Sequence, residues 1–354
     1  METLTLELTD MANGGDALGR DENKRVVFVP YTIPGETAQV RIVEDKGRFA
    51  HGRALEILEA APERAEPRCP HFGVCGACHW QHIDYEGQLR YKREIVGDQL
   101  ERIGRLEGVD IRPTLPNPEP WNYGVEATFS PTPDGSALGF YSPFLERVMP
   151  IDVCYIIRPV LVDLLHDIDF DFGDLRSITL RIGDDEALLV ALELENLEPP
   201  ELSTDMPLSI AVTLPGGGTA NLVGDNYVLQ SVGGRDFRVS ASSFFYPSPP
   251  AAELLVERVL DYAALSGSEL VLEGYSGVGM LTAFLAEQAA EVIAIESAPA
   301  AIDDAEVNLE ETNNVTLYAA TVEEVLPQLT VRPDLMIVDP PAEGLSRDVV
   351  EMIG

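Results

Sequence analysis

The chain has 354 residues, 45% of them hydrophobic and 24% charged, which is typical of a soluble globular protein with two or three domains. Its net charge of −36 excludes a surface that is basic throughout, so any surface for nucleic acid must be local. No apolar run reaches the ~20 residues of a membrane span and no signal-peptide pattern is present, so we expect a cytoplasmic protein without membrane contact.

Residues 1–60 show the pattern of a small β-barrel. Runs such as LTLEL, VVFVPY and TAQVRIVED read as short strands, and Gly14, Gly15 and IPGE supply turns. Within the first 110 residues lie 14 of the 24 lysines and arginines, and no lysine follows Lys92. We therefore expect a nucleic-acid surface in this part of the chain.

A cysteine cluster follows a Pro-rich linker at 61–67. The four cysteines of the chain are Cys69, Cys75, Cys78 and Cys154. In the reducing cytoplasm such a cluster more often binds metal than forms disulfides. Structural zinc and a [4Fe–4S] cluster both take four thiolates, although zinc ligands usually come as two close pairs, unlike these. His71, His79 and His82 are further possible ligands, but four thiolates already complete a site.

The predicted secondary structure after the cysteine cluster changes from a helix to a β-rich region and then to alternating strands and helices. DYEGQLRYKREIVGDQLERIG predicts a helix over 84–104 that ends at Gly104. The pattern from about 125 to 240 is β-rich and interrupted, and residues 250–265 predict another helix. Strand and helix patterns then alternate as far as residue 341, which predicts an open parallel sheet with helices on its faces.

The loop LEGYSGVGMLT follows a predicted strand, opens a helix, and carries Gly277 and Gly279. A lone G-x-G is weak evidence, because any tight strand–helix turn can contain it. Glu296 ends the next strand and is placed to accept from ribose hydroxyls, and Asp339 of D-P-P ends a later one. We expect a nucleoside ligand at these strand ends. NAD fits this pattern, while D-P-P favours S-adenosylmethionine.

Taken together, these motifs resemble the class I RNA uracil-carbon-5 methyltransferases of the TRAM-domain type, over essentially the whole chain. The TRAM module is resembled by FVPYTIPGETAQVRI. The family's iron–sulfur segment is resembled by RCPHFGVCGACHWQHIDYEGQLRYKRE. The family's donor-binding motifs are resembled by EGYSGVGMLT, IAIE and VDPPAEGLS. The resemblance implies a multidomain α/β and β protein. Its parts are a TRAM or OB-like barrel at 1–60, a β-rich central domain with an iron–sulfur cluster at 61–249, and a Rossmann-like methyltransferase domain at 250–354. We expect the helix near 84–104 to pack on the methyltransferase domain.

The resemblance also implies cofactors, partners and site residues. A [4Fe–4S] cluster would be held by C-x5-C-x2-C together with Cys154. The partner would be RNA, 23S rRNA in preference to tRNA, and we expect a monomer. S-adenosylmethionine would bind at Tyr246, Tyr275, Gly277, Gly279, Met280, Glu296, Thr321 and Asp339.

The sequence departs from this family where chemistry is expected. The family's nucleophilic cysteine, and the carboxylate that removes the proton from carbon 5, have no counterpart up to Gly354. We therefore expect an incomplete methyltransferase domain without catalytic residues of its own. Four other positions differ from the family's usual Gln, Asp, Cys and Arg: Tyr246, Glu273, Ser276 and Ala342. The alternative is a non-catalytic RNA-binding iron–sulfur protein derived from the family.

Overall fold

The computed structural model describes residues 2–168, 174–196, 207–214 and 218–353, which form two compact units. The first unit comprises Met1–Pro116 and Gly139–Tyr155, and the second comprises Asn117–Leu138 and Ile156–Gly354. The three-domain division expected from the sequence follows other boundaries and stays a prediction. Among the residues described, no helix combines the length and apolarity needed to cross a membrane.

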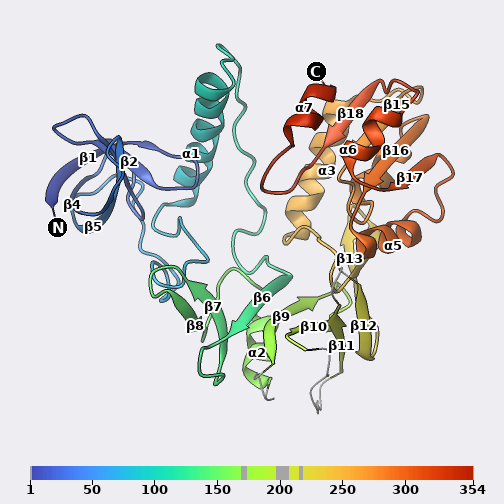
Figure 1. The fold of residues 1–354 in the computed structure, drawn as a ribbon, viewed down its shortest axis with the longest axis horizontal. Coiled ribbons are helices and arrows are strands. Elements are labelled where there is room, and N and C mark those ends of the chain that lie inside the picture. The colour runs from blue at the N-terminus through green and yellow to red at the C-terminus, as the bar shows by residue number, and fades with distance from the viewer. Residues whose placement is uncertain (1, 169–173, 197–206, 215–217, 354) are drawn as a thin grey trace. The chain divides into compact units, whose positions relative to one another are not determined.

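The first unit begins with a closed five-stranded β-barrel (Figure 1). Around the barrel the strands are β1 (Thr3–Met11), β2 (Ala17–Arg20), β3 (Val26–Val29), β5 (Phe49–Glu59) and β4 (Thr37–Asp45). Side chains alternate between the two faces of a strand, and Leu6, Leu8, Val27 and Val29 fill the interior. The barrel expected over residues 1–60 is confirmed.

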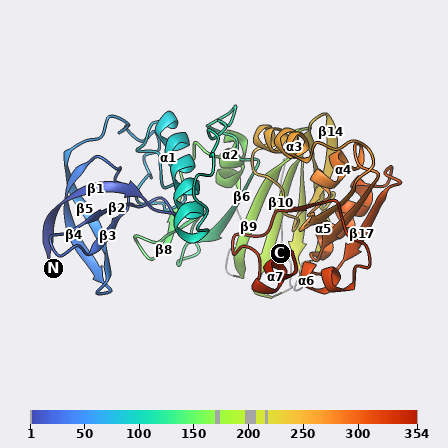
Figure 2. The ribbon, with the colours of Figure 1, turned by 90° about the horizontal axis from the view of Figure 1, so that it is seen from above.

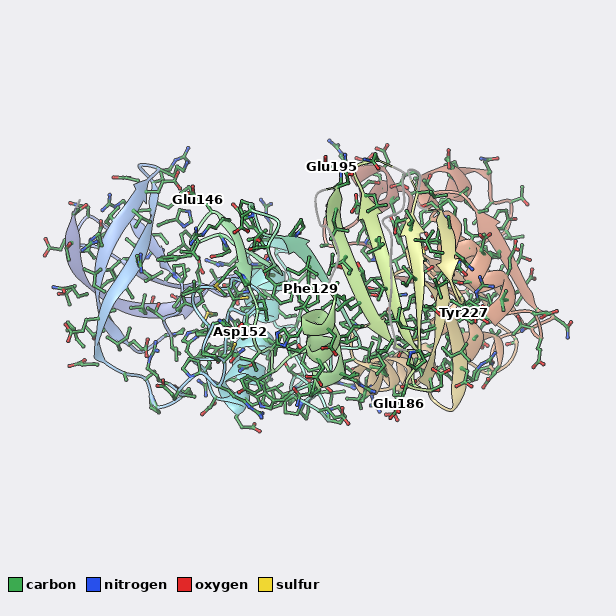
Figure 3. The ribbon with its side chains drawn as sticks, turned by 90° about the horizontal axis from the view of Figure 1, so that it is seen from below. Phe129, Glu146, Asp152, Glu186, Glu195 and Tyr227 are labelled. Carbon is green, nitrogen blue, oxygen red and sulfur yellow. The ribbon has the colours of Figure 1, made fainter. Side chains whose placement is uncertain are left out.

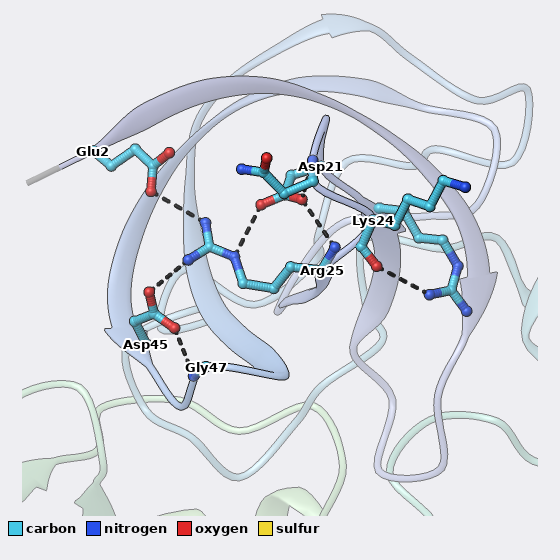
Figure 4. Close-up of polar contacts among 8 residues, drawn as sticks. Glu2, Asp21, Lys24, Arg25, Asp45 and Gly47 are labelled. Atoms are coloured by element: carbon cyan, nitrogen blue, oxygen red, sulfur yellow. Dashed lines mark hydrogen bonds and ion pairs between the residues drawn. The ribbon is translucent and has the colours of Figure 1, made fainter.

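Arg25 joins three segments of this barrel (Figure 4). Its guanidinium contacts the carboxylates of Asp21 at 2.9 Å, Asp45 at 2.6 Å and Glu2 at 3.1 Å. Asp21 also accepts the backbone N–H of Arg25, which closes the turn between β2 and β3. The charge of Arg25 is therefore satisfied within the protein.

A helix and a hairpin complete the first unit. The helix α1 (Tyr85–Asp98) is capped by Asp84, which accepts the N–H of Gly87 at 2.6 Å. It continues as a turn of π-helix (Gln99–Ile103) and ends at Gly104, as the sequence predicts. The hairpin consists of β7 (Leu138–Ser142) and β8 (Arg147–Pro150), with Glu146 at its turn and Asp152 just after it (Figure 3).

The second unit contains a mainly antiparallel sheet in the order β12-β11-β10-β9-β6, and among its described residues only β10 and β11 pair in parallel. These strands are β6 (Glu126–Pro131), β9 (Leu175–Ile182), β10 (Leu188–Leu194), β11 (Leu208–Thr213) and β12 (Thr219–Val223). The helix α2 (Pro159–Asp167) precedes β9, and β13 (Tyr227–Val232) pairs with β14 (Arg235–Ser240). Phe129 marks β6 and Tyr227 marks β13 in Figure 3. The β-rich pattern expected from about 125 to 240 is confirmed in the described residues.

The last part of the second unit is the predicted α/β layer. Its elements are α3 (Pro249–Ala263), β15 (Leu270–Gly274), α4 (Met280–Ala286), β16 (Glu291–Glu296), α5 (Pro299–Asn308), β17 (Val315–Ala319), α6 (Val322–Val325), a 3-10 turn (Leu326–Gln328), β18 (Leu335–Val338) and α7 (Arg347–Ile353). The four strands are parallel and lie in the order β17-β16-β15-β18. Strand order therefore reverses between β15 and β18, and ligands in such sheets bind at the carboxyl ends of the strands beside this point.

Helices cover both faces of the parallel sheet, as Figure 2 shows for α3 and α4 on one side and α6 and α7 on the other. Val271 and Val292 pack against residues of α3, α4 and α5. Leu272 and Ile293 point the other way and pack against residues of α6 and α7. Both faces are therefore buried, and the strand ends are left as the place where polar residues gather.

Candidate functional site

The loop after β15 has three residues in the left-handed backbone region. They are Tyr275 with φ 64°, Gly277 with φ 56° and Gly279 with φ 83°. Glycine adopts this region without strain, whereas a tyrosine there is uncommon, and such residues concentrate at functional sites. A Cβ at Gly277 would meet no atom within 4 Å, so space lies open beside this turn.

Glu296 holds this loop in place from the end of β16. One carboxylate oxygen accepts the backbone N–H of Gly277 at 2.8 Å. The other accepts the N–H groups of Ser297 and Ala298, each at 2.7 Å. A carboxylate has about four acceptor positions, so three internal bonds leave room for one further donor.

Tyr246 and Asp339 meet beside the reversal of strand order. Asp339 follows β18, Tyr246 lies in the connection between β14 and α3, and the phenol donates a hydrogen bond to the carboxylate. Burial, together with the charge of Asp339, raises the pKa of Tyr246 far above its usual value. The phenol therefore stays neutral and acts as a donor. The Gln that the resemblance implies at this position is replaced by a group that still donates.

Glu273, the fourth residue of β15, is a buried acid in the same region. Its side chain is 3% exposed and accepts a hydrogen bond from Thr282 at 2.6 Å. Burial, reinforced by the charges of Asp339 and Glu296, raises the pKa of Glu273 to about 8. Its carboxyl group is therefore protonated at neutral pH, which avoids a third charge beside two carboxylates.

Two predicted donor-site residues have structural roles. Met280 begins α4, and its side chain is 3% exposed within the hydrophobic core. Thr321 caps α6: its hydroxyl accepts the N–H of Glu324, whose carboxylate in turn accepts from Thr321. The structure thus gathers Tyr246, Asp339, Glu296 and the 275–279 loop at the strand ends and uses the side chains of Met280 and Thr321 for packing and capping.

Phe244 and Ser276 were not predicted as site residues. Phe244 is 68% exposed, and its ring lies 5.6 Å from that of Tyr246, whereas the neighbouring Phe245 is buried. The three successive aromatic residues Phe244, Phe245 and Tyr246 were a usable signal, because three large consecutive side chains seldom all fit into one core. The hydroxyl of Ser276 is buried and has no hydrogen-bond partner among the described residues. Unpaired buried polar groups of this kind often mark a ligand position.

All four cysteines come together in the first unit, where they line one small cavity with Gln81, His71 and Tyr155 among others. Burial, and to a smaller extent the neighbouring thiols, raises the pKa of Cys75 and of Cys78. His71 faces this cavity and its Nε2 is buried without a partner among the described residues. His82 instead approaches the carbonyl of Thr32 at 3.3 Å, and burial lowers its pKa to about 4.

The donor set of this cavity suits a group held by four thiolates, because such groups require cysteine sulfurs from one small volume. Within residues 2–168, 174–196, 207–214 and 218–353, no three His, Cys, Asp or Glu side chains are arranged as a ready metal site. The residue types and their convergence therefore fit such a group, while the side-chain positions do not yet form its coordination.

Comparisons with known proteins agree with this architecture. Residues 1–55 match the TRAM domain model. The chain is 32% identical to an uncharacterized RNA methyltransferase of Halalkalibacterium halodurans, over 99% of this chain and 85% of that protein. It is 33% identical to one of Synechocystis, over 98% of this chain and 83% of that protein. The fold resembles that of the Pyrococcus abyssi tRNA (uracil-54, C5)-methyltransferase in complex with S-adenosyl-L-homocysteine. That TM-score is 0.69 at 24% identity, over 98% of this chain and 86% of that one.

Proposed function

Since this chain belongs to the RNA methyltransferases and carries a TRAM domain, we propose that it serves methyl transfer from S-adenosylmethionine to carbon 5 of a uridine in RNA. The substrate we expect is 23S rRNA in preference to tRNA. One observation carries the proposal. The Tyr246–Asp339 pair and the loop held by Glu296 both lie at the carboxyl ends of the parallel strands, beside β18 and β15, where open α/β sheets bind their ligands.

The donor would lie against the 275–279 loop. Glu296 has one acceptor position left for a ribose hydroxyl, and the turn at Gly277 leaves space for a ligand close to the backbone. The unpaired hydroxyl of Ser276 offers a further hydrogen bond. S-adenosylmethionine, when bound, supplies an electrophilic methyl group on a sulfonium. The acidic surroundings created by Glu296 and Asp339 suit that positive charge.

The target base would lie against Phe244. An exposed aromatic ring stacks on a base taken out of its own stack, and each such contact contributes about 1–3 kcal/mol. Asp339 is an exposed carboxylate close to this ring through Tyr246, and it can accept the N3–H of uracil. Tyr246 orients that carboxylate with its phenol, so we assign it a positioning role.

The covalent step needs a group that the second unit does not contain. Carbon 5 of uracil becomes nucleophilic only after a nucleophile adds at carbon 6, and a cysteine thiolate is the side chain suited to this addition. The four cysteines of the 354 residues all line the cavity of the first unit. We therefore assign donor binding and base binding to the residues described and assign no nucleophile among them.

We further propose that Cys69, Cys75, Cys78 and Cys154 hold a [4Fe–4S] cluster. Their convergence on one cavity supports this, as does the resemblance of the C-x5-C-x2-C segment. Cys154 is distant in sequence from the other three, so a bound cluster would tie the 69–78 loop to the segment after β8. Its role would be structural, in the part of the chain that carries the barrel.

The alternative is an RNA-binding protein of this family without transferase activity. The positions of the cysteines favour this alternative, because the second unit, where the donor is proposed to bind, contains no cysteine that could act as the nucleophile. Calorimetric titration of the protein with S-adenosylmethionine separates the two. Binding of the donor that is weakened in Glu296→Ala supports the methyltransferase. A protein that binds RNA but no donor would contradict it and favour the alternative.

A further inference from the structure

The segment Ser240–Tyr246 carries both aromatic residues of the proposed base position, and most of it lies outside the helices and strands. The strand β14 ends at Ser240, and α3 begins at Pro249. Phe244 leaves 68% of its side chain exposed, so contact with the core fixes little of its ring. Buried backbone groups in such a segment need hydrogen-bond partners from other parts of the protein.

Arg181 of β9 binds the carbonyl groups of this segment. Its side chain is 4% exposed, and its guanidinium donates to the carbonyl oxygens of Ser240 at 2.6 Å and of Ser243 at 2.8 Å. The carboxylate of Glu126 contacts the same guanidinium and balances its charge. A buried charge is tolerated where it is paired and hydrogen-bonded, and Arg181 meets both conditions. It therefore connects the antiparallel sheet to two backbone positions beside Phe244.

Asp304 of α5 binds the donor groups of the same two serines. Its side chain is 0% exposed and accepts the backbone N–H of Ser240 at 2.7 Å. It also accepts the hydroxyl groups of Ser240 and Ser243, each at 2.6 Å. The guanidinium of Arg238 lies 3.0 Å from this carboxylate and balances its charge. Two buried charges of opposite sign, from two different elements, therefore hold one short segment.

The helix α5 holds the 275–279 loop as well. The side-chain amide of Asn308 donates to the carbonyl of Val278 at 2.9 Å and to that of Arg238 at 3.0 Å. The same helix thus binds the loop of the proposed donor site through Asn308 and the segment Ser240–Tyr246 through Asp304. All of these residues belong to the second unit. The contacts of α5 therefore set where this segment lies relative to the proposed donor.

We propose that Arg181 and Asp304 are positioning residues, which fix the segment Ser240–Tyr246 so that the ring of Phe244 is ready to stack on the target base. The inference deepens the proposed function and rests on Phe244 being the base position. Neither Arg181 nor Asp304 is part of the proposed donor or base contacts. Ordering a mobile side chain during binding costs free energy, so a ring that is fixed beforehand binds a base more tightly. Disturbing either charge should therefore weaken base binding although every ligand contact remains.

The first measurement is fluorine NMR of the full chain labelled with para-fluorophenylalanine, in which the resonance missing from Phe244→Leu identifies the ring. Arg181→Lys keeps the charge but loses the planar fork that serves two carbonyl groups. Asp304→Asn replaces a group that only accepts by one that also donates. We expect the Phe244 resonance to shift or broaden in both variants. Ser243→Ala removes a single hydroxyl and is the milder variant, which should also shift this resonance.

The second measurement is base binding, with two short oligoribonucleotides of abasic units, one of which carries a single uracil. The ratio of the two affinities isolates the contact of the base. We expect a ratio of about tenfold for the parent protein. For Arg181→Lys and Asp304→Asn we expect about threefold or less, because the ring must then be ordered during binding. Arg176→Lys and Asp303→Asn, at exposed positions of the same strand and helix, are the matched controls and should behave like the parent protein.

A role in stability alone would lower Tm but leave the Phe244 resonance and the affinity ratio of the folded protein unchanged, and this result would overturn the proposal. The same changes in Arg176→Lys or Asp303→Asn would also overturn it, as would a changed resonance with an unchanged ratio. A parent protein without preference for uracil would instead contradict the base position in the proposed function. The resonance would then decide by itself whether Arg181 and Asp304 fix the ring.

Discussion

The phenol of Tyr246 donates a hydrogen bond to the carboxylate of Asp339, which lies 93 positions later and follows β18. This contact connects the segment before α3 to the strand beside the reversal of sheet order. The resemblance implies a glutamine at this position, and the tyrosine that stands there is also a hydrogen-bond donor, which orients the carboxylate of Asp339.

Replacing Tyr246 by Phe should therefore destabilise the second unit without unfolding it. The change removes one hydrogen bond to a charged group, for which about 1–3 kcal/mol is usual, while the ring contacts with Phe244 and Phe245 remain. Urea denaturation measures the difference in the free energy of unfolding. Tyr318→Phe, on β17, is the matched control and should have no effect. Equal stabilities of Tyr246→Phe and the parent protein would mean that the contact does not form in solution.

Glu273 should make stability depend on pH. Its pKa is raised from 4.5 to about 8 in the folded protein, so the folded state binds a proton that the unfolded state releases. The stability from this group is complete below about pH 4.5 and is lost as the pH rises towards about 8. Glu273→Gln should flatten the fall of Tm across this window.

Glu257→Gln, at an exposed position on α3, controls for the loss of one carboxylate and should leave the pH profile of the parent protein unchanged. Parallel profiles of Tm against pH for Glu273→Gln and the parent protein would show that Glu273 ionises normally.

Glu296→Ala should weaken S-adenosylmethionine binding by about 1–3 kcal/mol, because it removes both the acceptor proposed for the ribose and the bond to the N–H of Gly277. Isothermal titration calorimetry gives the Kd. Glu291→Ala, at the exposed start of the same strand, should bind the donor like the parent protein. If the two variants have the same affinity, the role given to Glu296 is wrong.

Anaerobically purified protein should be brown and contain about four irons per chain, since four thiolates are the usual ligands of a [4Fe–4S] cluster. Cys154→Ser should lose or destabilise the cluster, whereas His71→Ala should keep it, because a histidine is not required beside four cysteines. Measuring the iron and zinc content of the purified protein distinguishes a [4Fe–4S] cluster from a structural zinc site. Stoichiometric zinc without iron would show a structural zinc site instead.

The elements of the fold were largely predictable, because the signals that define them are local. Alternating apolar residues predicted the barrel, and alternation of strand and helix patterns predicted the parallel sheet. The grouping of residues 61–116 with the barrel was not predictable, since it depends on contacts between segments distant in sequence. Convergence of Cys154 with the other cysteines came only from a family resemblance.

The candidate site was predictable in part for a similar reason. The sequence motifs correctly placed Glu296 and Asp339 at strand ends, because the end of an apolar strand can be recognised from the sequence pattern. They could not show that the side chain of Met280 points into the core, which depends on the rotation of α4. The sequence around Thr321 also carried the pattern of a capping box, in which Thr is followed three residues later by Glu. The side chain of Thr321 has this capping role at the start of α6.

The most direct test is the transfer of labelled methyl groups from S-adenosylmethionine to unmodified 23S rRNA and tRNA, followed by nucleoside analysis. Residues 1–354 alone should form no 5-methyluridine, because their four thiols line the cavity of the first unit. The same chain, extended by a C-terminal segment with the nucleophilic cysteine that the family resemblance implies, should form 5-methyluridine in 23S rRNA, and Asp339→Ala should abolish it. Methylation of a base other than uridine, or 5-methyluridine formed by residues 1–354 alone, would contradict the function proposed.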